Sequence, residues 1–223
     1  MGGLSARAVT FRFPASDRPV VSGVDLMVAA GEQLALVGPS GSGKSTLLHL
    51  LAGILVPTQG SVEFDGQELG ALDADGRAEI RLREFGFVFQ FAELLPELSL
   101  AENVELPLRM LGRTGSRKAA FEALDRLGVA SVADQLPSQA SGGERQRAAI
   151  ARATVHGPRV VFADEPTGAL DHDNGELVIT TLERVCRESG ASLLVVTHDA
   201  DVAAHVDRIV SLRDGRLEGV AHR

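Results

Sequence analysis

The most specific chemical feature of the sequence is the run from Gly38 to Thr46, which reads Gly-Pro-Ser-Gly-Ser-Gly-Lys-Ser-Thr. It matches G-x-x-x-x-G-K-[ST] in full, the pattern of a loop that binds nucleotide phosphates. Glycines let backbone N–H groups converge on phosphate oxygens, and the helix expected next adds its positive end. In this pattern Lys44, one of only two lysines in the chain, reaches the β- and γ-phosphates, and the Ser45 hydroxyl binds Mg²⁺. The residues expected to contact the nucleotide here are Gly38, Ser40, Gly41, Ser42, Gly43, Lys44, Ser45 and Thr46.

A pair of carboxylates follows an apolar strand pattern later in the chain. Val160 to Ala163 is apolar, and Asp164 and Glu165 come directly after it. Neighbouring side chains of a strand point to opposite sides, so the two acids can take different roles. We expect Asp164 to hold Mg²⁺ and Glu165 to polarise the attacking water. A solvated acidic turn is the alternative, but a complete phosphate loop in the same chain favours the catalytic interpretation.

A glycine pair opens a third candidate element. The run from Ser141 to Arg147 reads Ser-Gly-Gly-Glu-Arg-Gln-Arg, and Ser141 and Glu144 have the spacing of a capping box. This predicts a helix that continues through Ala153 and stops at Gly157-Pro158. The pattern is consistent with nothing more than a well-capped helix. It equally suits an anion site, because the glycines leave backbone donors open at the positive helix end.

The same run resembles the signature motif of the ATP-binding cassette (ABC) ATPases, usually written L-S-G-G-Q. The other markers of that family stand in its order: Gln90, the run from Gly168 to Asp171, and Val196-Thr197-His198-Asp199. The resemblance covers residues 9–217. Residues 163–171, 86–90 and 94–104 are most similar to the macrolide-export and lipoprotein-release branch, whose members work with a separate membrane permease.

The resemblance implies roles for several residues. Ser141, Gly142, Gly143 and Glu144 would contact ATP bound to a second copy in a head-to-tail dimer, and Asp171 belongs to the same nucleotide-contacting set. His198 would contact the γ-phosphate, and Gln90 would order Mg²⁺ and the attacking water. Phe13 is the expected adenine stacker and Phe11 the runner-up, with core packing open for either. Ala140 replaces the usual Leu of the motif, and Glu144 replaces the usual Gln, which places an acid near the signature.

Around these motifs the sequence predicts an α/β fold with a mostly parallel sheet, because apolar strand patterns alternate with helical ones. The predicted strands span residues 9–13, 24–28, 33–37, 61–64, 86–89, 160–163, 192–196 and 208–212, the last closing into a hairpin at Asp214-Gly215. Helix patterns dominate residues 91–157, including a capping box at Ser99–Glu102. The resemblance implies a single ABC ATPase domain over 1–223. Residues 1–90 and 158–223 would form its P-loop core with an N-terminal antiparallel β part, and 91–157 an inserted helical subdomain.

Composition narrows the possible partners. The chain carries a net charge of −8 with a pI near 5.3, which argues against a nucleic-acid partner. Cys186 is the single cysteine, so neither a disulfide framework nor a multi-cysteine metal site is possible. No transmembrane or signal segment is expected, which predicts a cytoplasmic protein that lies at the inner face of the bacterial membrane through its permease.

The leading hypothesis is therefore an ATPase subunit that dimerises on ATP and powers a permease for lipoprotein, peptide or macrolide-like cargo. A soluble ABC ATPase acting on DNA or ribosomes and a small-molecule kinase are the alternatives. The first conflicts with the acidic charge, and the second gives the signature run and His198 no purpose. Phe91, Leu94 and Leu95 either pack in the core or form the surface that receives the permease.

Overall fold

The computed structural model describes residues 3–14 and 16–222, with the backbone alone for 220–222. The chain divides into two compact units. Unit 1 comprises Met1–Arg81 and Ser192–Arg223, and unit 2 comprises Leu82–Ala191. Unit 2 thus contains residues 91–157 together with one strand before them and one strand and a long helix after them.

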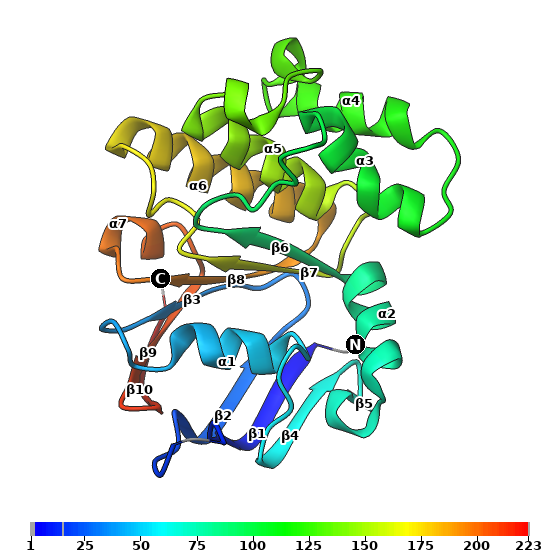
Figure 1. Cartoon of the computed structure of the whole chain (residues 1–223). Coiled ribbons are helices and arrows are strands. Elements are labelled where there is room, and N and C mark those ends of the chain that lie inside the picture. Colours follow the sequence, from blue (N-terminus) through cyan, green and yellow to red (C-terminus); the bar gives the residue numbers. More distant parts are fainter. Residues whose placement is uncertain (1–2, 15, 223) are drawn as a thin grey trace. The chain divides into compact units, whose positions relative to one another are not determined.

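Unit 1 begins with an antiparallel sheet in the order β2-β1-β4-β5 (Figure 1). Its strands are β1 (Leu4–Phe11), β2 (Val21–Val28), β4 (Gln59–Phe64) and β5 (Gln67–Glu68). Buried side chains alternate along β2, as expected for a sheet with one covered face. In β1 the alternation breaks at Ala8, whose φ is 47° and whose N–H donates to Asp25 Oδ1 at 2.8 Å. β1 starts at Leu4 and not at the predicted residue 9, because the break at Ala8 separates its first half from the alternating pattern seen in the sequence.

The remaining strands of unit 1 are β3 (Gln33–Val37), β8 (Ser192–Thr197), β9 (Arg208–Arg213) and β10 (Arg216–His222). β3 lies between β8 and β9 and is parallel to both, so the predicted parallel core is confirmed here. β9 and β10 form the expected hairpin, with positive φ at Asp214 and Gly215. Almost every side chain of β3 and β8 is buried, which explains their continuous apolar sequence. The helical elements are α1 (Lys44–Leu51), η1 (Leu69–Ala71) and α7 (Ala200–Ala203), and α2 (Ala74–Glu84) crosses from unit 1 into unit 2.

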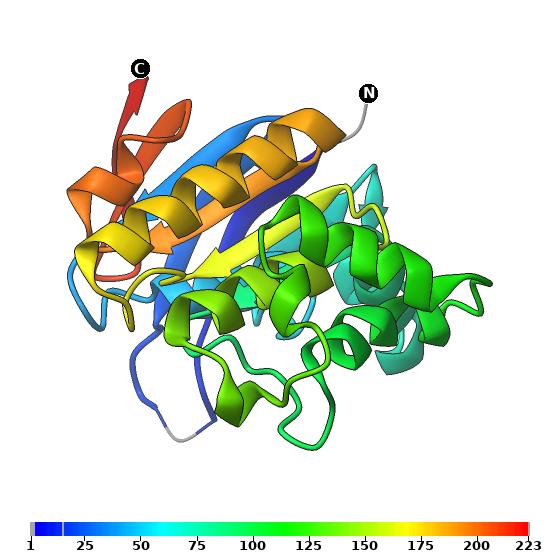
Figure 2. The same cartoon turned by 90° about the horizontal axis from the view of Figure 1, so that it is seen from above.

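Unit 2 combines two parallel strands with a set of helices. β6 (Phe85–Phe89) pairs with β7 (Val160–Asp164), and the ring of Phe162 contacts those of Phe85 and Phe87. Figure 2 shows α3, α4 and α5 gathered together in green, and they pack on one another. The helices are α3 (Leu100–Met110), α4 (Ser116–Arg126), η2 (Ala130–Val132), η3 (Pro137–Gln139), α5 (Gly142–Thr154) and α6 (His172–Ser189). In the described part of the chain, no helix combines the length and apolar character needed to cross a bilayer.

Candidate functional site

The phosphate loop of unit 1 connects the buried strand β3 to helix α1. Gly38, Gly41 and Gly43 have φ values of 153°, 78° and 101°, a region that side chains rarely adopt. A Cβ at Gly38 would lie 2.1 Å from the carbonyl oxygen of Leu212, and one at Gly43 would lie 2.6 Å from that of Val20. A side chain at either position would clash with a neighbouring backbone carbonyl, so the fold requires glycine at both positions of the sequence pattern.

The polar groups of this loop fit a bound anion. Lys44 is buried, and its Nζ donates to the carbonyl oxygens of Gly38 at 2.8 Å and Pro39 at 3.2 Å. The buried Ser42 Oγ has no hydrogen-bond partner among the described residues. No side chain caps α1, and no acidic residue lies in its first turn. An open helix N-terminus beside an ammonium group and an unsatisfied hydroxyl is a favourable environment for phosphate.

Two further predicted residues of unit 1 lie outside the loop itself. His198 directly follows β8, and the last residue of β8, Thr197, is the register partner of Val37 at the end of β3. His198 and the phosphate loop therefore start from neighbouring strand ends. Phe11 is buried, whereas Phe13 is 43% exposed and meets the Phe11 ring edge-on at 4.9 Å. Phe13 keeps a free surface on which a base could stack, and Phe11 belongs to the core.

In unit 2 the strand pair β6–β7 brings the glutamine and the acids together. Phe89 is the register partner of Asp164, so Gln90 and Glu165 directly follow the ends of two paired strands. Glu165 has a φ of 47°, an uncommon conformation for a residue with a side chain. A Cβ at Gly168 would lie 2.9 Å from Gln90 Nε2, so the glutamine side chain lies directly over Gly168. The structure therefore groups Gln90, the acids and the start of the 168–171 run.

The signature run caps helix α5 as predicted. Ser141 N–H donates to Glu144 Oε2 at 2.8 Å, and Glu144 N–H donates to Ser141 Oγ at 3.3 Å. The Ser141 hydroxyl also donates to Glu144 Oε2 at 2.7 Å. These bonds, the one from the hydroxyl first, lower the pKa of Glu144 below its ordinary value because they favour the carboxylate. The acid at the position of the usual Gln is thus an ionised partner of Ser141.

Asp171 lies close to the signature run through a residue that the sequence patterns did not single out. Asp171 caps α6 by accepting from Asn174 N–H at 2.9 Å and from Asn174 Nδ2 at 2.8 Å. These bonds lower the pKa of Asp171. The Asn174 Oδ1 atom would lie 2.7 Å from a Cβ at Gly143, so Asn174 packs directly on the signature glycine. The sequence holds no local signal for this contact, because it depends on how α5 and α6 meet.

The segment after Gln90 is exposed and strained. Phe91 and Leu95 are 74% and 44% exposed, and Leu94 is half-buried, so Phe91 and Leu95 are not core residues. Ala92 and Glu93 have φ values of 62° and 47°. Each left-handed residue of this kind costs on the order of 1–2 kcal/mol. Contacts from elsewhere in the unit must compensate for this strain.

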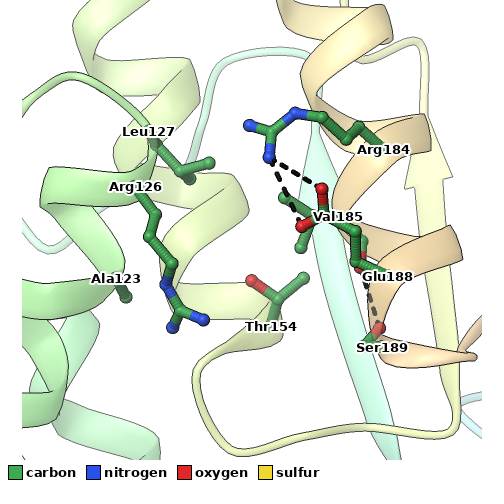
Figure 3. Close-up of a pocket in the computed structure, with 8 residues that line it drawn as sticks. All are labelled: Ala123, Arg126, Leu127, Thr154, Arg184, Val185, Glu188 and Ser189. Carbon is green, nitrogen blue, oxygen red and sulfur yellow. Dashed lines mark hydrogen bonds and ion pairs between the residues drawn. The ribbon is translucent and has the colours of Figure 1, made fainter.

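The described residues of unit 2 line a smaller and a larger cavity. The smaller, of about 120 Å³, is lined by Gln90 and by Gly142 of the signature run, among others. The larger, of about 170 Å³, lies between α4, the end of α5 and α6 (Figure 3). Arg126 extends into it, and Arg184 pairs with Glu188 at 3.2 Å on its far side. None of the motif residues lines this larger cavity, so it is separate from the candidate site.

Comparison with known proteins identifies the family. The family model described as ABC transporter matches residues 21–168. The chain belongs to this family. It is an ATP-hydrolysing subunit of an ABC transporter, with the α/β fold of an ABC cassette. The ABC cassette interpretation of the sequence is thereby confirmed, including its place near the macrolide-export and lipoprotein-release branch.

Individual relatives agree with this assignment. The "Lipoprotein-releasing system ATP-binding protein LolD" of Shewanella frigidimarina is 47% identical over 91% of this chain and 85% of its own length. The "Macrolide export ATP-binding/permease protein MacB" of Burkholderia thailandensis is 46% identical over 97% of this chain, which spans 34% of that protein. The ATP-binding cassette MJ0796, solved as a dimer in a post-hydrolysis state with ADP and Pi, is 38% identical over 98% of both chains, with a TM-score of 0.90.

Proposed function

We propose that this ABC transporter ATPase forms a head-to-tail dimer on ATP and powers a separate integral membrane permease at the inner face of the bacterial membrane. Its cargo would be a lipoprotein, a peptide or a macrolide-like molecule. The supporting observation is the match to LolD proteins at 45–47% identity over 85–96% of their length. The MacB relative, in contrast, is named as an ATP-binding/permease protein, and this chain spans only 34% of its length.

Each motif then takes a chemical role. The phosphate loop and Lys44 bind the β- and γ-phosphates, and His198 contacts the γ-phosphate. Glu165 acts as general base toward the attacking water. Ser45, Gln90 and Asp164 would hold Mg²⁺. The ion, when bound, neutralises charge that develops on the phosphates.

The remaining contacts concern the base and the second copy. Phe13 is the proposed adenine stacker, since its ring keeps an exposed face while Phe11 is buried. Ser141, Gly142, Gly143 and Glu144 form the surface that meets ATP on the partner copy, with Asp171 beside it. The open amides of Gly142 and Gly143 at a positive helix end suit an anionic γ-phosphate. Nucleic acid has no part in this proposal, in keeping with the net charge of −8.

The dimer and the general base are tested together. Glu165→Gln should keep ATP affinity and lose turnover by about 10²-fold or more, because the water has no base. ATP should then trap a dimer visible by light scattering, since the closed state cannot hydrolyse its ATP. Lys44→Ala in the Glu165→Gln background should form no dimer. As a control in the wild-type background, Glu176→Gln removes an exposed carboxylate and should leave turnover unchanged. Phosphate release near the wild-type rate in Glu165→Gln would contradict the assignment.

The permease contact is proposed at Phe91 and Leu95, which follow Gln90 and expose apolar surface. Leu95→Asp should leave the chain folded and able to bind ATP, yet unable to co-purify with its permease. Leu177→Asp is the matched control, because Leu177 is also an exposed leucine of unit 2, at 50%. If Leu95→Asp still co-purifies with full permease-stimulated turnover, the contact lies elsewhere.

A further inference from the structure

The loop after Gln90 is held by side chains of α5, the helix that begins in the signature run and is called the signature helix below. Arg152 lies in the last turn of α5, and its guanidinium is a planar fork. Nη1 donates to the carbonyl oxygen of Glu93 at 2.6 Å, and Nη2 donates to that of Ala92 at 2.8 Å. The fork therefore binds the carbonyls of the same two residues that have left-handed backbone conformations.

A second side chain of α5 holds the other side of Gln90. Gln146 is buried, and its Nε2 donates to the carbonyl oxygen of Phe89 at 2.8 Å. Within residues 89–93 the local backbone bonds are turn contacts, from Ala92 N–H to Phe89 O at 3.1 Å and from Glu93 N–H to Phe91 O at 2.7 Å. Gln90 thus projects from a backbone that α5 holds both before and after it.

Arg152 is half-buried, so it gives up part of its hydration to make these bonds. Burial lowers the pKa of its guanidinium, although the nearby Glu93 carboxylate acts in the opposite direction. A cation taken out of water in this way is retained only where its hydrogen bonds are good. Within the described part of the chain, both hydrogen bonds of Arg152 go to carbonyl oxygens of the strained backbone, and none goes to a carboxylate.

We infer that Arg152 is a positioning residue for ATP hydrolysis: its guanidinium holds the loop after Gln90 in a strained conformation and so fixes where the Gln90 side chain lies. The inference rests on the proposed role of Gln90. In this conformation Gln90 lies over Gly168 and lines the same small cavity as Gly142 of the signature helix. The signature helix and the Gln90 loop are therefore expected to move together.

A spectroscopic reporter tests the loop directly. The chain has no Trp and no Tyr, so Phe91→Trp at this 74% exposed position gives a tryptophan signal from the loop alone. In this background Arg152→Lys should shift the emission maximum, because a compact ammonium on a flexible stem does not reproduce the fixed, planar fork that binds the carbonyls of Ala92 and Glu93. Adding Ala92→Gly should return the signal, since glycine adopts a positive φ without strain. Arg126→Lys, an exposed arginine of the same unit, is the control and should leave the signal unchanged.

Turnover separates positioning from simple support of the fold. Arg152→Lys should lower kcat about tenfold or more with KM for ATP within about twofold of wild type, because it displaces Gln90 and leaves the phosphate loop intact. Ala92→Gly should recover at least half of that kcat. A role in fold stability alone predicts a lower melting temperature with no such recovery, and that result would overturn the inference.

A second pair of variants keeps the test valid if Arg152→Lys fails to fold. Glu93 is exposed with a φ of 47°, so a side-chain change there disturbs no core packing. Glu93→Val adds a β-branched residue to a left-handed position and should lower kcat, whereas Glu93→Gly should not. Equal kcat in the two variants would overturn the inference. A Glu165→Gln variant that keeps its turnover would instead contradict the proposed function, whatever the outcome at Arg152 or Glu93.

Discussion

Helices α3 and α5 begin with the same capping box, yet they differ in whether the N–H groups of their first two residues have hydrogen-bond acceptors. At α3, Ser99 N–H donates to Glu102 Oε2 at 2.8 Å and Glu102 N–H donates to Ser99 Oγ at 3.2 Å. At α5 the corresponding bonds of Ser141 and Glu144 are 2.8 and 3.3 Å. Local capping therefore does not distinguish a structural helix start from a functional one.

The two residues after the serine make the difference. In α3 these are Leu100 and Ala101, both fully buried, and their N–H groups donate to the carbonyl oxygens of Gln135 and Ala133 at 2.9 and 2.8 Å. In α5 they are Gly142, which is half-buried, and Gly143, which is buried under Asn174, and among the described residues neither N–H group has an acceptor. The α3 start is closed by hydrogen bonds within the chain, whereas the α5 start has two N–H donors without an acceptor among the described residues, which suits the proposed phosphate contact.

The largest expected effect comes from changing the first residue after each serine. Leu100→Ala removes a fully buried side chain and should cost roughly 2–5 kcal/mol, a fall in melting temperature of about 10 °C. Gly142→Ala should leave the melting temperature within about 2 °C, because its Cβ meets only the ends of two flexible side chains, Leu170 Cδ2 at 3.2 Å and Arg145 Nη2 at 3.9 Å. It should instead lower ATPase turnover at least about tenfold by crowding the open amides.

Thermal unfolding and steady-state ATPase assays measure these two effects. ATP affinity of the isolated chain should stay unchanged in Gly142→Ala, since the phosphate loop is a separate element of unit 1. A Gly142→Ala protein with normal turnover would show that the open amides are not used. Leu100→Ala with an unchanged melting temperature would show that α3 is not anchored by its first residue.

A smaller contrast is expected for the two capping serines. Ser99→Ala and Ser141→Ala each remove a cap and should each destabilise the protein by about 1 kcal/mol, or 2–4 °C. Only Ser141→Ala should also reduce ATP-driven dimer formation, because its hydroxyl is exposed while Ser99 is buried. Light scattering in the Glu165→Gln background measures the dimer. Equal loss of dimer in both variants would mean that the cap acts only through stability.

The sequence predicts the α5 start well because glycine pairs and capping residues are local signals. The phosphate loop, the Asp164-Glu165 pair and most strands were predictable for the same reason, since each depends on residue type at a fixed spacing. Helix α6 was missed although Val178, Ile179, Leu182 and Cys186 are buried at helical spacing and Gly190 ends the helix. Helix α2 has no buried residue, so it offers no apolar pattern to find.

Contacts between distant segments could not be predicted from local patterns. The hydrogen bonds from Arg152 to Ala92 and Glu93 join residues about 60 positions apart, and nothing at Arg152 distinguishes it from other arginines of the chain. The left-handed backbone at Ala92 and Glu93 is also invisible, because neither residue is a usual choice for positive φ. Likewise, the packing of Asn174 on Gly143 depends on how α5 and α6 meet.

The smallest expected effect concerns the pKa values of the two capping glutamates. Both are lowered from 4.5, with the backbone bond from Ser99 as the largest cause at Glu102 and the side-chain bond from Ser141 as the largest at Glu144. In each case the folded state binds fewer protons than the unfolded state just below pH 4.5. The stabilisation is therefore present above that pH and is lost as the pH falls through the folded-state pKa.

Ser141→Ala should raise the pKa of Glu144 toward 4.5 by more than Ser99→Ala raises that of Glu102. Carboxyl ¹³C NMR titration would measure both, with Glu144→Gln and Glu102→Gln assigning the signals. Equal shifts would show that the two serine hydroxyls stabilise their glutamates equally, and that the two helix starts differ only in the residues that follow the serine.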